Sequence, residues 1–253
     1  LISILITNHN KNKYLHKNLK NCFKQNYNNF EVIVYDDRST DNSIKTLGKF
    51  KKIKLIKNNK NFLYPALNQL EGLMYAFKKS KGNIICLLDA DDYFHIDKLK
   101  LINIFFNLNM NKNVLFDIPY SKYKNFIPKI KKHSYSIWPS IIPTSGISLR
   151  RKTMKNFFEF SKFKKFPHLE IDSRMMIFSY HYLEEMSFIK KKITYYNIDE
   201  NGISSKYKKF SKLWWIKRLQ AFTYVKYILK KKNKNFIISF DYVITFLICF
   251  FLK

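Results

Sequence analysis

Asn83-Ile-Ile-Cys-Leu-Leu-Asp-Ala-Asp-Asp-Tyr-Phe94 carries the clearest structural signal in this chain. Its five consecutive apolar residues, Ile84 to Leu88, do not alternate with polar ones, which is typical of a strand buried on both faces of a parallel sheet. Three acids follow at once: Asp89, Asp91 and Asp92. Because an unpaired carboxylate is costly to bury, we expect all three acids at an exposed strand end, beside a cation.

Two kinds of cation are compatible with these acids. The chain contains 47 Lys and Arg residues, so neighbouring basic side chains are one source. A divalent metal ion is the more specific interpretation, since Mg²⁺ and Mn²⁺ prefer oxygen ligands and are held by one or two carboxylates together with substrate phosphates. Open α/β sheets also bind ligands at the carboxyl ends of their strands. The Asp-x-Asp pattern therefore predicts either a metal site or a short acidic turn.

Strand and helix patterns alternate through the first part of the chain. We expect strands at residues 2–7, 30–35, 53–56 and 84–88, separated by helices over 14–23, 44–50 and 65–79. This alternation indicates βαβ units and a mainly parallel sheet flanked by helices. Asp36 and Asp37 follow the second strand, so the acids of the second and fourth strands are expected to face one cleft.

The pattern is less regular in the second part of the chain. Strands are expected at residues 113–119 and 144–150 and helices over 97–108 and 175–183, while 120–140 is predicted to be rich in loops. Glu170 and Asp172 precede the last of these helices. A carboxylate is favoured at a helix N-terminus by the helix dipole, so either acid is a functional group or only a cap.

Composition narrows the function classes. The net charge of +29 suggests nucleic-acid binding, but abundant Lys, Asn, Ile, Phe and Tyr with scarce Gly and Pro indicate a compositional drift of the whole sequence. We therefore predict no specific nucleic-acid partner. Cys22, Cys86 and Cys249 are scattered, which supports neither a disulfide framework nor a zinc site. With no secretory signal recognised, we expect a cytoplasmic protein.

Three motifs together resemble the family 2 glycosyltransferases. Ile2-Ser-Ile-Leu-Ile-Thr-Asn-His-Asn10 and Glu31-Val-Ile-Val-Tyr-Asp-Asp-Arg-Ser-Thr-Asp-Asn-Ser43 resemble the start of that domain, and Lys81-Gly-Asn-Ile-Ile-Cys-Leu-Leu-Asp-Ala-Asp-Asp92 resembles its Asp-x-Asp strand. The resemblance implies a GT-A-like α/β fold with a Rossmann-like nucleotide-binding half. It also implies inverting transfer of a sugar from a nucleoside diphosphate donor, with a UDP-sugar favoured and Mn²⁺ or Mg²⁺ as cofactor. The implied acceptor is a glycan or lipid-linked hydroxyl, in bacterial surface polysaccharide or lipopolysaccharide synthesis.

The same resemblance assigns roles to residues of the donor site. Thr7 and His9 would line the nucleobase and ribose pocket, and Asp37 would accept a hydrogen bond from the base. Asp89 would approach the ribose or the metal. Asp91 would be the main metal ligand and would bridge the cation to the diphosphate.

Asp172 falls where the family carries its catalytic base, with Glu170 as the rival candidate. Inversion requires one carboxylate to deprotonate the acceptor hydroxyl. Two departures from the family pattern are Gly72, in a helix that often carries Asn-x-Gly, and Ile96, where Pro is common. Acceptor specificity is expected to reside in residues 120–138 and 144–148.

The chain is expected to divide into three parts. Residues 1–120 form the nucleotide-sugar-binding half, residues 121–205 the acceptor-binding half with the catalytic base, and residues 206–253 a C-terminal helical extension, basic and aromatic. In that tail, apolar residues recur at helical spacing among lysines, which fits either packing onto the domain or contact with an anionic membrane. A second apolar run, residues 236–252, is interrupted by Asp241, and its uncharged part, residues 242–252, falls well short of the roughly 20 residues that span a bilayer. We therefore expect peripheral contact with the inner face of the cytoplasmic membrane.

Other functions fit less well. A nucleotidyltransferase-like enzyme shares the nucleotide and metal chemistry but normally opens with a Gly-rich phosphate loop, and this chain has only five Gly. A basic nucleic-acid-binding protein without sugar transfer is favoured by charge alone. A degenerate, non-catalytic binding module is disfavoured because Asp37, Asp89, Asp91 and Asp172 are all present.

Overall fold

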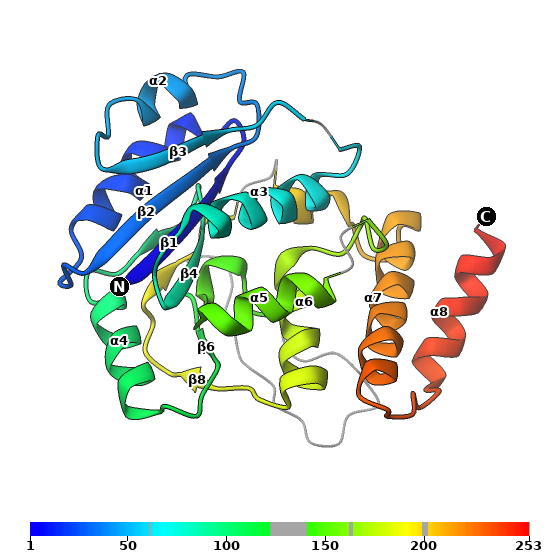
Figure 1. Ribbon diagram of the computed structural model, residues 1–253. Helices are drawn as coiled ribbons and strands as arrows, with labels where there is room; N and C mark the ends of the chain where they lie inside the picture. The colour runs from blue at the N-terminus through cyan, green and yellow to red at the C-terminus, as the bar shows by residue number, and fades with distance from the viewer. Residues whose placement is uncertain (61, 122–140, 162–163, 199–201, 253) are drawn as a thin grey trace.

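A mixed β-sheet runs through the molecule, and helices cover both of its faces (Figure 1). The computed structural model describes residues 1–60, 62–121, 141–161, 164–198 and 202–252. Within these ranges the main sheet has seven strands in the order β3-β2-β1-β4-β7-β6-β8. Their bounds are β1 Ile2–Asn8, β2 Phe30–Asp36, β3 Ile53–Lys57, β4 Ile84–Asp89, β6 Val114–Asp117, β7 Ile147–Arg150 and β8 Phe188–Ile189. A small second sheet pairs β5 (Tyr93–Phe94) with β9 (Thr194–Tyr195).

The sheet is mainly parallel, as predicted from the alternating pattern. β1 pairs in parallel with both β2 and β4, β2 pairs in parallel with β3, and β6 with β8. β7 differs, because it runs antiparallel to β4 on one side and to β6 on the other. The predicted strand at 144–150 is also shorter, since Thr144–Gly146 form the 3₁₀ turn η1.

The helices follow the strands as expected, with one shift in a boundary that affects the site. Their bounds are α1 Asn12–Phe23, α2 Ser43–Leu47, α3 Pro65–Lys79, α4 Lys98–Leu108, α5 Arg151–Phe160, α6 Ile171–Phe178, α7 Lys212–Lys231 and α8 Phe240–Phe251, with a π-helical turn η2 at Ser179–Leu183 and a 3₁₀ turn η3 at Ile203–Lys206. The helix predicted over 175–183 thus begins earlier, at Ile171. Asp172 consequently lies in its first turn.

Alternating side chains of the strands divide the core into two layers. Ile2, Ile4 and Ile6 of β1 belong to a layer shared with α1, α2 and α4. Leu5, on the opposite face, belongs to a layer shared with α3, α5, α6 and α7. This arrangement follows from the period of two along a strand and explains why β4 is apolar throughout.

The carboxyl ends of β2, β1 and β4 meet at one edge of the sheet. Thr7 pairs with Tyr35 of β2 on one side and with Asp89 of β4 on the other. β1 is therefore the strand at which the chain order reverses, and an open α/β sheet forms its ligand crevice at such a point.

The first helix of the tail packs onto the rest of the domain. Ala221, Tyr224, Val225 and Ile228 of α7 are buried in the same layer as α6, and α8 lies along α7 (Figure 1). For α7, packing onto the domain is therefore the arrangement found. Among the helices of the described ranges, none combines the length and apolar character that a membrane crossing requires.

Candidate functional site

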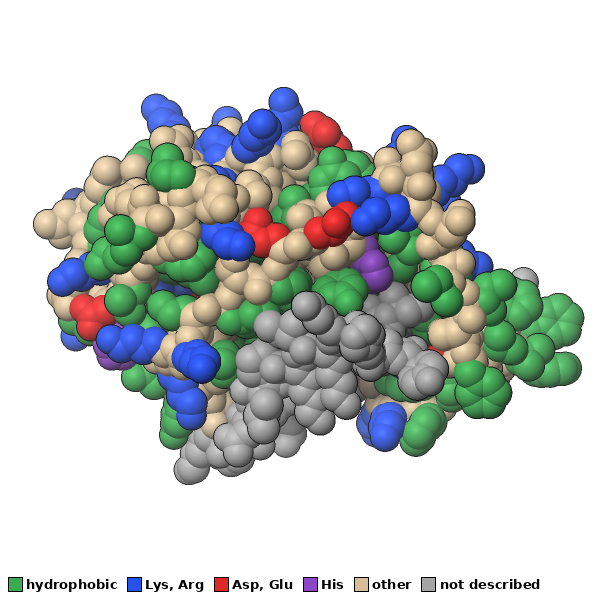
Figure 2. Space-filling view, turned by 90° about the horizontal axis from the view of Figure 1, so that it is seen from below, with side chains coloured by type: hydrophobic (Ala, Val, Ile, Leu, Met, Phe, Trp, Pro, Cys, Tyr) green, Lys and Arg blue, Asp and Glu red, His purple; other side chains and the backbone are tan. Residues whose placement is uncertain are grey.

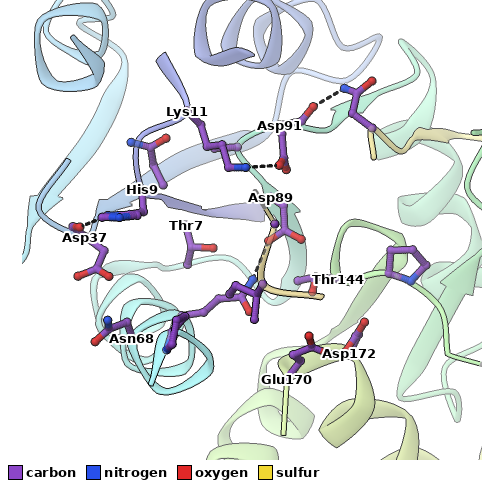
Figure 3. Close-up of a pocket in the computed structure, with 18 of the residues that line it drawn as sticks. Thr7, His9, Lys11, Asp37, Asn68, Asp89, Asp91, Thr144, Glu170 and Asp172 are labelled. Carbon is purple, nitrogen blue, oxygen red and sulfur yellow. Dashed lines mark hydrogen bonds and ion pairs between the residues drawn. The ribbon is translucent and has the colours of Figure 1, made fainter. Parts of the chain in front are cut away.

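A cavity of about 680 Å³ opens at the carboxyl ends of β1, β2 and β4 (Figure 3). It is bounded by the loops after these strands, by α3, and by the start of α6 on the opposite side. All the site residues predicted from the sequence line this cavity: Thr7, His9, Asp37, Asp89, Asp91, Glu170 and Asp172. Segments far apart in the chain thus converge on one place, although their individual roles remain predictions.

The side of the cavity next to β2 is shaped by His9 and Asp37. His9 Nδ1 lies 2.6 Å from the main-chain oxygen of Asp37, which fixes the imidazole across the ends of β1 and β2. The Asp37 carboxylate accepts hydrogen bonds from Asn58 Nδ2 at 2.7 Å and from Arg38 Nε at 3.1 Å. Asp36 does not line the cavity, and its carboxylate accepts a hydrogen bond from Asn8 Nδ2 at 2.6 Å, so the two adjacent acids have different environments.

The three acids after β4 do not share one environment. Asp89 and Asp91 line the cavity, but Asp92 is only 1% exposed, which corrects our expectation that all three acids lie at an exposed strand end. The Asp92 carboxylate accepts hydrogen bonds from Ser145 Oγ at 2.5 Å and from the Asn197 amide at 2.8 Å. These bonds satisfy the buried oxygens, so Asp92 joins the acidic loop to neighbouring segments.

Asp89 and Asp91 each have a partner that the sequence did not indicate. Gln69 Nε2 of α3 donates to Asp89 Oδ1 at 2.9 Å. Lys11 Nζ lies 2.9 Å from Asp91 Oδ2, and this ion pair is visible in Figure 3. The Asp89 amide donates to Ser145 Oγ at 2.9 Å, so the backbone of the loop is held as well.

The site holds an excess of negative charge. Burial, followed by the neighbouring carboxylates of Asp91 and Asp172, raises the pKa of Asp89 to about 7. Burial and the charges of Asp91 and Asp89 also raise the pKa of Asp92. Carboxylates that disfavour one another's ionisation are stabilised when a cation binds among them.

The donor set fits a hard divalent cation of the Mg²⁺ or Mn²⁺ type. In the described part of the chain, no cluster of three or more His, Cys, Asp or Glu side chains is arranged to hold a metal. Such ions are commonly held by one or two carboxylates and by phosphates of the substrate. Asp89 and Asp91, both carboxylates facing the cavity, are the residues that would hold it.

The opposite wall is formed by the start of α6. Glu170 is the N-cap residue, is 6% exposed and forms an ion pair with Lys217 of α7. Asp172 lies in the first helical turn and is partly exposed; its Oδ1 accepts a hydrogen bond from the Ser173 amide at 2.5 Å. The two candidate bases are thereby distinguished, because the carboxylate of Glu170 is already engaged by a cation.

Several residues that shape the site carried no recognisable motif. Lys11 lay in the polar turn after the first strand, whereas Gln69, Ser145 and Asn197 come from segments whose proximity only the fold reveals. Of the predicted acceptor region, Thr144 lines the cavity. Residues 122–140 lie outside the described residues.

Comparison with known proteins identifies the family. The profile described as "Glycosyl transferase family 2" matches residues 3–186, which include the acidic loop and the start of α6. The chain belongs to this family. The family predicted from the motifs is thereby confirmed.

Two curated relatives match the N-terminal part. An uncharacterized glycosyltransferase of Haemophilus influenzae is 38% identical over 104 residues, or 40% of this chain and 40% of the relative. The Escherichia coli enzyme WfaP is 31% identical over 99 residues, or 39% of this chain and 38% of the relative. Its full name is UDP-Glc:alpha-D-GlcNAc-diphosphoundecaprenol beta-1,3-glucosyltransferase. The matched part spans about two-fifths of the length of these relatives.

Solved structures resemble nearly the whole chain. Staphylococcus aureus TarS 1-349 in complex with UDP-GlcNAc has a TM-score of 0.65 at 17% identity, covering 98% of this chain and 70% of that one. The mannosyltransferase PcManGT from Pyrobaculum calidifontis, in complex with GDP-Man and Mn²⁺, has a TM-score of 0.62 at 13% identity, covering 98% and 69%. These likenesses show the fold, and the predicted GT-A-like architecture is confirmed.

Proposed function

We propose that this glycosyltransferase moves a sugar from a nucleoside diphosphate donor, with a UDP-sugar favoured, to a glycan or lipid-linked acceptor hydroxyl. The reaction would proceed with inversion and with Mn²⁺ or Mg²⁺. The observation that carries this proposal is the arrangement of one cavity, with Thr7, His9 and Asp37 on one side, Asp89 and Asp91 in the middle, and the α6 carboxylates opposite.

The donor would occupy the side of the cavity next to β2. His9 and Thr7 line this region, and the Asp37 carboxylate is positioned by Asn58 to accept a hydrogen bond from the base. Asp89 and Asp91 would hold the cation together with the diphosphate. When bound, such an ion offsets the negative charge that develops on the leaving diphosphate.

Asp172 is the carboxylate that we assign as the general base. It would accept the proton of the acceptor hydroxyl while that oxygen forms a bond to the anomeric carbon and the bond from this carbon to the diphosphate breaks. Inversion follows from attack opposite the leaving group. Glu170 is less suited to the role because it is buried and paired with Lys217.

An acceptor from bacterial surface polysaccharide or lipopolysaccharide synthesis would place this enzyme at a membrane. The name of the Escherichia coli relative specifies a diphosphoundecaprenol-linked acceptor, which supports a lipid-linked substrate. We propose that the chain is cytoplasmic and makes peripheral contact with the inner face of the cytoplasmic membrane through α8.

The apolar face of α8 supports this contact. Phe240, Phe246, Phe250 and Phe251 are between 49% and 81% exposed. Hydrophobic side chains gather at the right-hand edge of Figure 2, where α8 lies. Lys230 and Lys231, at the end of α7 and close in sequence to the start of this helix, are exposed and complement anionic headgroups.

A screen for release of nucleoside diphosphate tests the proposal. The full chain is incubated with a set of nucleotide sugars and Mn²⁺, and we expect slow hydrolysis of one or more UDP-sugars that ceases when EDTA removes the metal. Salt-sensitive oligonucleotide binding with no turnover of any nucleotide sugar would instead support the nucleic-acid-binding alternative. Transfer of a nucleotidyl group, with release of pyrophosphate, would support a nucleotidyltransferase.

A further inference from the structure

Lys11 holds the carboxylate that the proposed function assigns to the metal. It lies on the loop between β1 and α1, and its ammonium is 2.9 Å from Asp91 Oδ2. The Lys11 and Asp91 side chains are 18% and 16% exposed, so the pair is partly shielded from water. Figure 3 shows the Lys11 side chain directed across the cavity toward Asp91.

An ammonium and a divalent cation compete for the same carboxylate. Binding of the cation to Asp91 without a nucleotide would break the ion pair or leave the Lys11 charge beside that of the metal. Both outcomes are unfavourable at a partly buried position, where charges are screened less than at the surface. Lys11 therefore lowers the affinity of Asp91 for the cation alone.

A bound nucleoside diphosphate would remove this penalty on cation binding. The diphosphate brings anionic oxygens into the cavity that Lys11 also lines, so the displaced ammonium finds new acceptors there. Lysine suits this exchange because its charge is compact and its four-carbon stem is flexible. The Asp91 carboxylate, released from Lys11, can then bind the cation.

We propose that Lys11 is a switch between these two partners: it neutralises Asp91 in the empty site and binds the diphosphate of the donor when cation and nucleotide arrive together. This inference rests on the proposed function. It makes binding of the cation and of the nucleotide cooperative, and that cooperativity is reciprocal.

The experiment compares Lys11→Gln, Lys11→Arg and Lys13→Gln with the wild type. Calorimetry measures the affinity for Mn²⁺ alone and the affinity for UDP in saturating Mn²⁺. Lys13→Gln is the matched control, because Lys13 lies two residues away, is exposed and contacts the Tyr14 ring, and its replacement changes net charge by the same amount. Circular dichroism is used to check that each variant is folded.

Opposite effects on the two affinities are expected for Lys11→Gln. Its affinity for Mn²⁺ alone rises by about 3-fold to 10-fold, and its affinity for UDP in saturating Mn²⁺ falls by about 10-fold, the size of one charge-assisted hydrogen bond. Lys11→Arg keeps most of the cooperativity, and Lys13→Gln behaves as the wild type.

Other outcomes overturn the switch. A Lys11→Gln variant with the same two affinities as the wild type would contradict the exchange of partners. A loss in both affinities or a gain in both would contradict it equally. A gain for Mn²⁺ alone with unchanged UDP affinity would make Lys11 only a blocking group. A wild-type protein that binds no nucleoside diphosphate with Mn²⁺ would overturn the proposed function and this inference with it.

Discussion

The three acids after β4 show how neighbouring residues of one type acquire different tasks. Asp92 is buried and bonded to Ser145 and Asn197, whereas Asp89 and Asp91 face the cavity. The buried acid fixes the loop, and this fixed loop presents the other two carboxylates. A metal site needs such support because ligands that move lose affinity.

Replacement of Asp91 by Asn tests the assignment of the metal ligand. The Asn side chain keeps the shape but loses the charge, so we expect the affinity for UDP in the presence of Mn²⁺ to fall by about 10-fold or more. Calorimetry of UDP binding with Mn²⁺ measures the change. Unchanged affinity would rule out Asp91 as the main ligand.

The two carboxylates of α6 are separated by a paired comparison. Asp172→Asn should leave UDP binding intact and reduce turnover by a factor of about 10² to 10⁴, the usual range for a positioned general base. Glu170→Gln should affect turnover less, but should lower the thermal unfolding temperature because Lys217 loses the charge of its partner. If the two variants exchange behaviour in the turnover assay, Glu170 is the base.

Among the elements of the fold, α4 contributes one buried lysine, Lys98, that connects the end of β6 to the η1 turn before β7. Lys98 of α4 is fully buried, and its Nζ donates to Asp117 Oδ2 at 2.7 Å and to the main-chain oxygen of Ser145 at 2.7 Å. Ser145 in turn contacts both Asp89 and Asp92. The end of β6, the η1 turn and the acidic loop are therefore held by one network.

Removal of Lys98 leaves Asp117 as an uncompensated buried charge. We expect Lys98→Met to lower the free energy of unfolding by about 3–5 kcal/mol, as for other broken buried ion pairs. Urea denaturation measures the loss. The double variant Lys98→Met/Asp117→Asn should recover part of it, and a Lys98→Met protein as stable as the wild type would contradict the proposed importance of this pair.

The elements of the first half were predicted well because their signals are local. The strand pattern at β4 and the helical spacing of α3 depend on neighbours in sequence, and both elements form as expected. The sequence alone marks Gly72 only as a departure from the family pattern. A Cβ there would lie 2.5 Å from the Tyr35 ring, so its small size permits α3 to approach β2.

Features that depend on distant contacts were not predictable from the sequence. The antiparallel direction of β7 is set by its partners β4 and β6, and the burial of Asp92 depends on Ser145 and Asn197. For the same reason, the sequence placed Glu170 and Asp172 together but could not show that Lys217 pairs with only one of them.

At the scale of the whole molecule, the two tail helices differ in their surroundings. α7 is built into the core beside α6, so its removal would expose apolar residues of the domain such as Phe166, whose ring packs against Tyr224 of α7. α8 is attached to α7 by the Arg218–Asp241 ion pair and by a 2.6 Å hydrogen bond from Lys226 Nζ to the Tyr242 hydroxyl. The opposite face of α8 is apolar and exposed, so membrane contact is best tested by substitutions on that face.

The full chain with Phe246→Ser and Phe250→Ser is therefore compared with the wild type in co-sedimentation with vesicles. Phe246 and Phe250 are 49% and 61% exposed, so the substitutions remove apolar area without opening the core. Since burial of one Phe side chain contributes about 1.5–3 kcal/mol, we expect binding to phosphatidylglycerol vesicles to weaken by about 10-fold or more.

Wild-type binding should also decrease at high salt, because salt screens the attraction between the exposed lysines near α8 and the anionic headgroups. Leu63→Ser/Leu108→Ser is the matched control, since these side chains are 85% and 79% exposed on other elements and should bind vesicles as the wild type does. Equal sedimentation of wild type and α8 variant would show that this face does not contact the membrane.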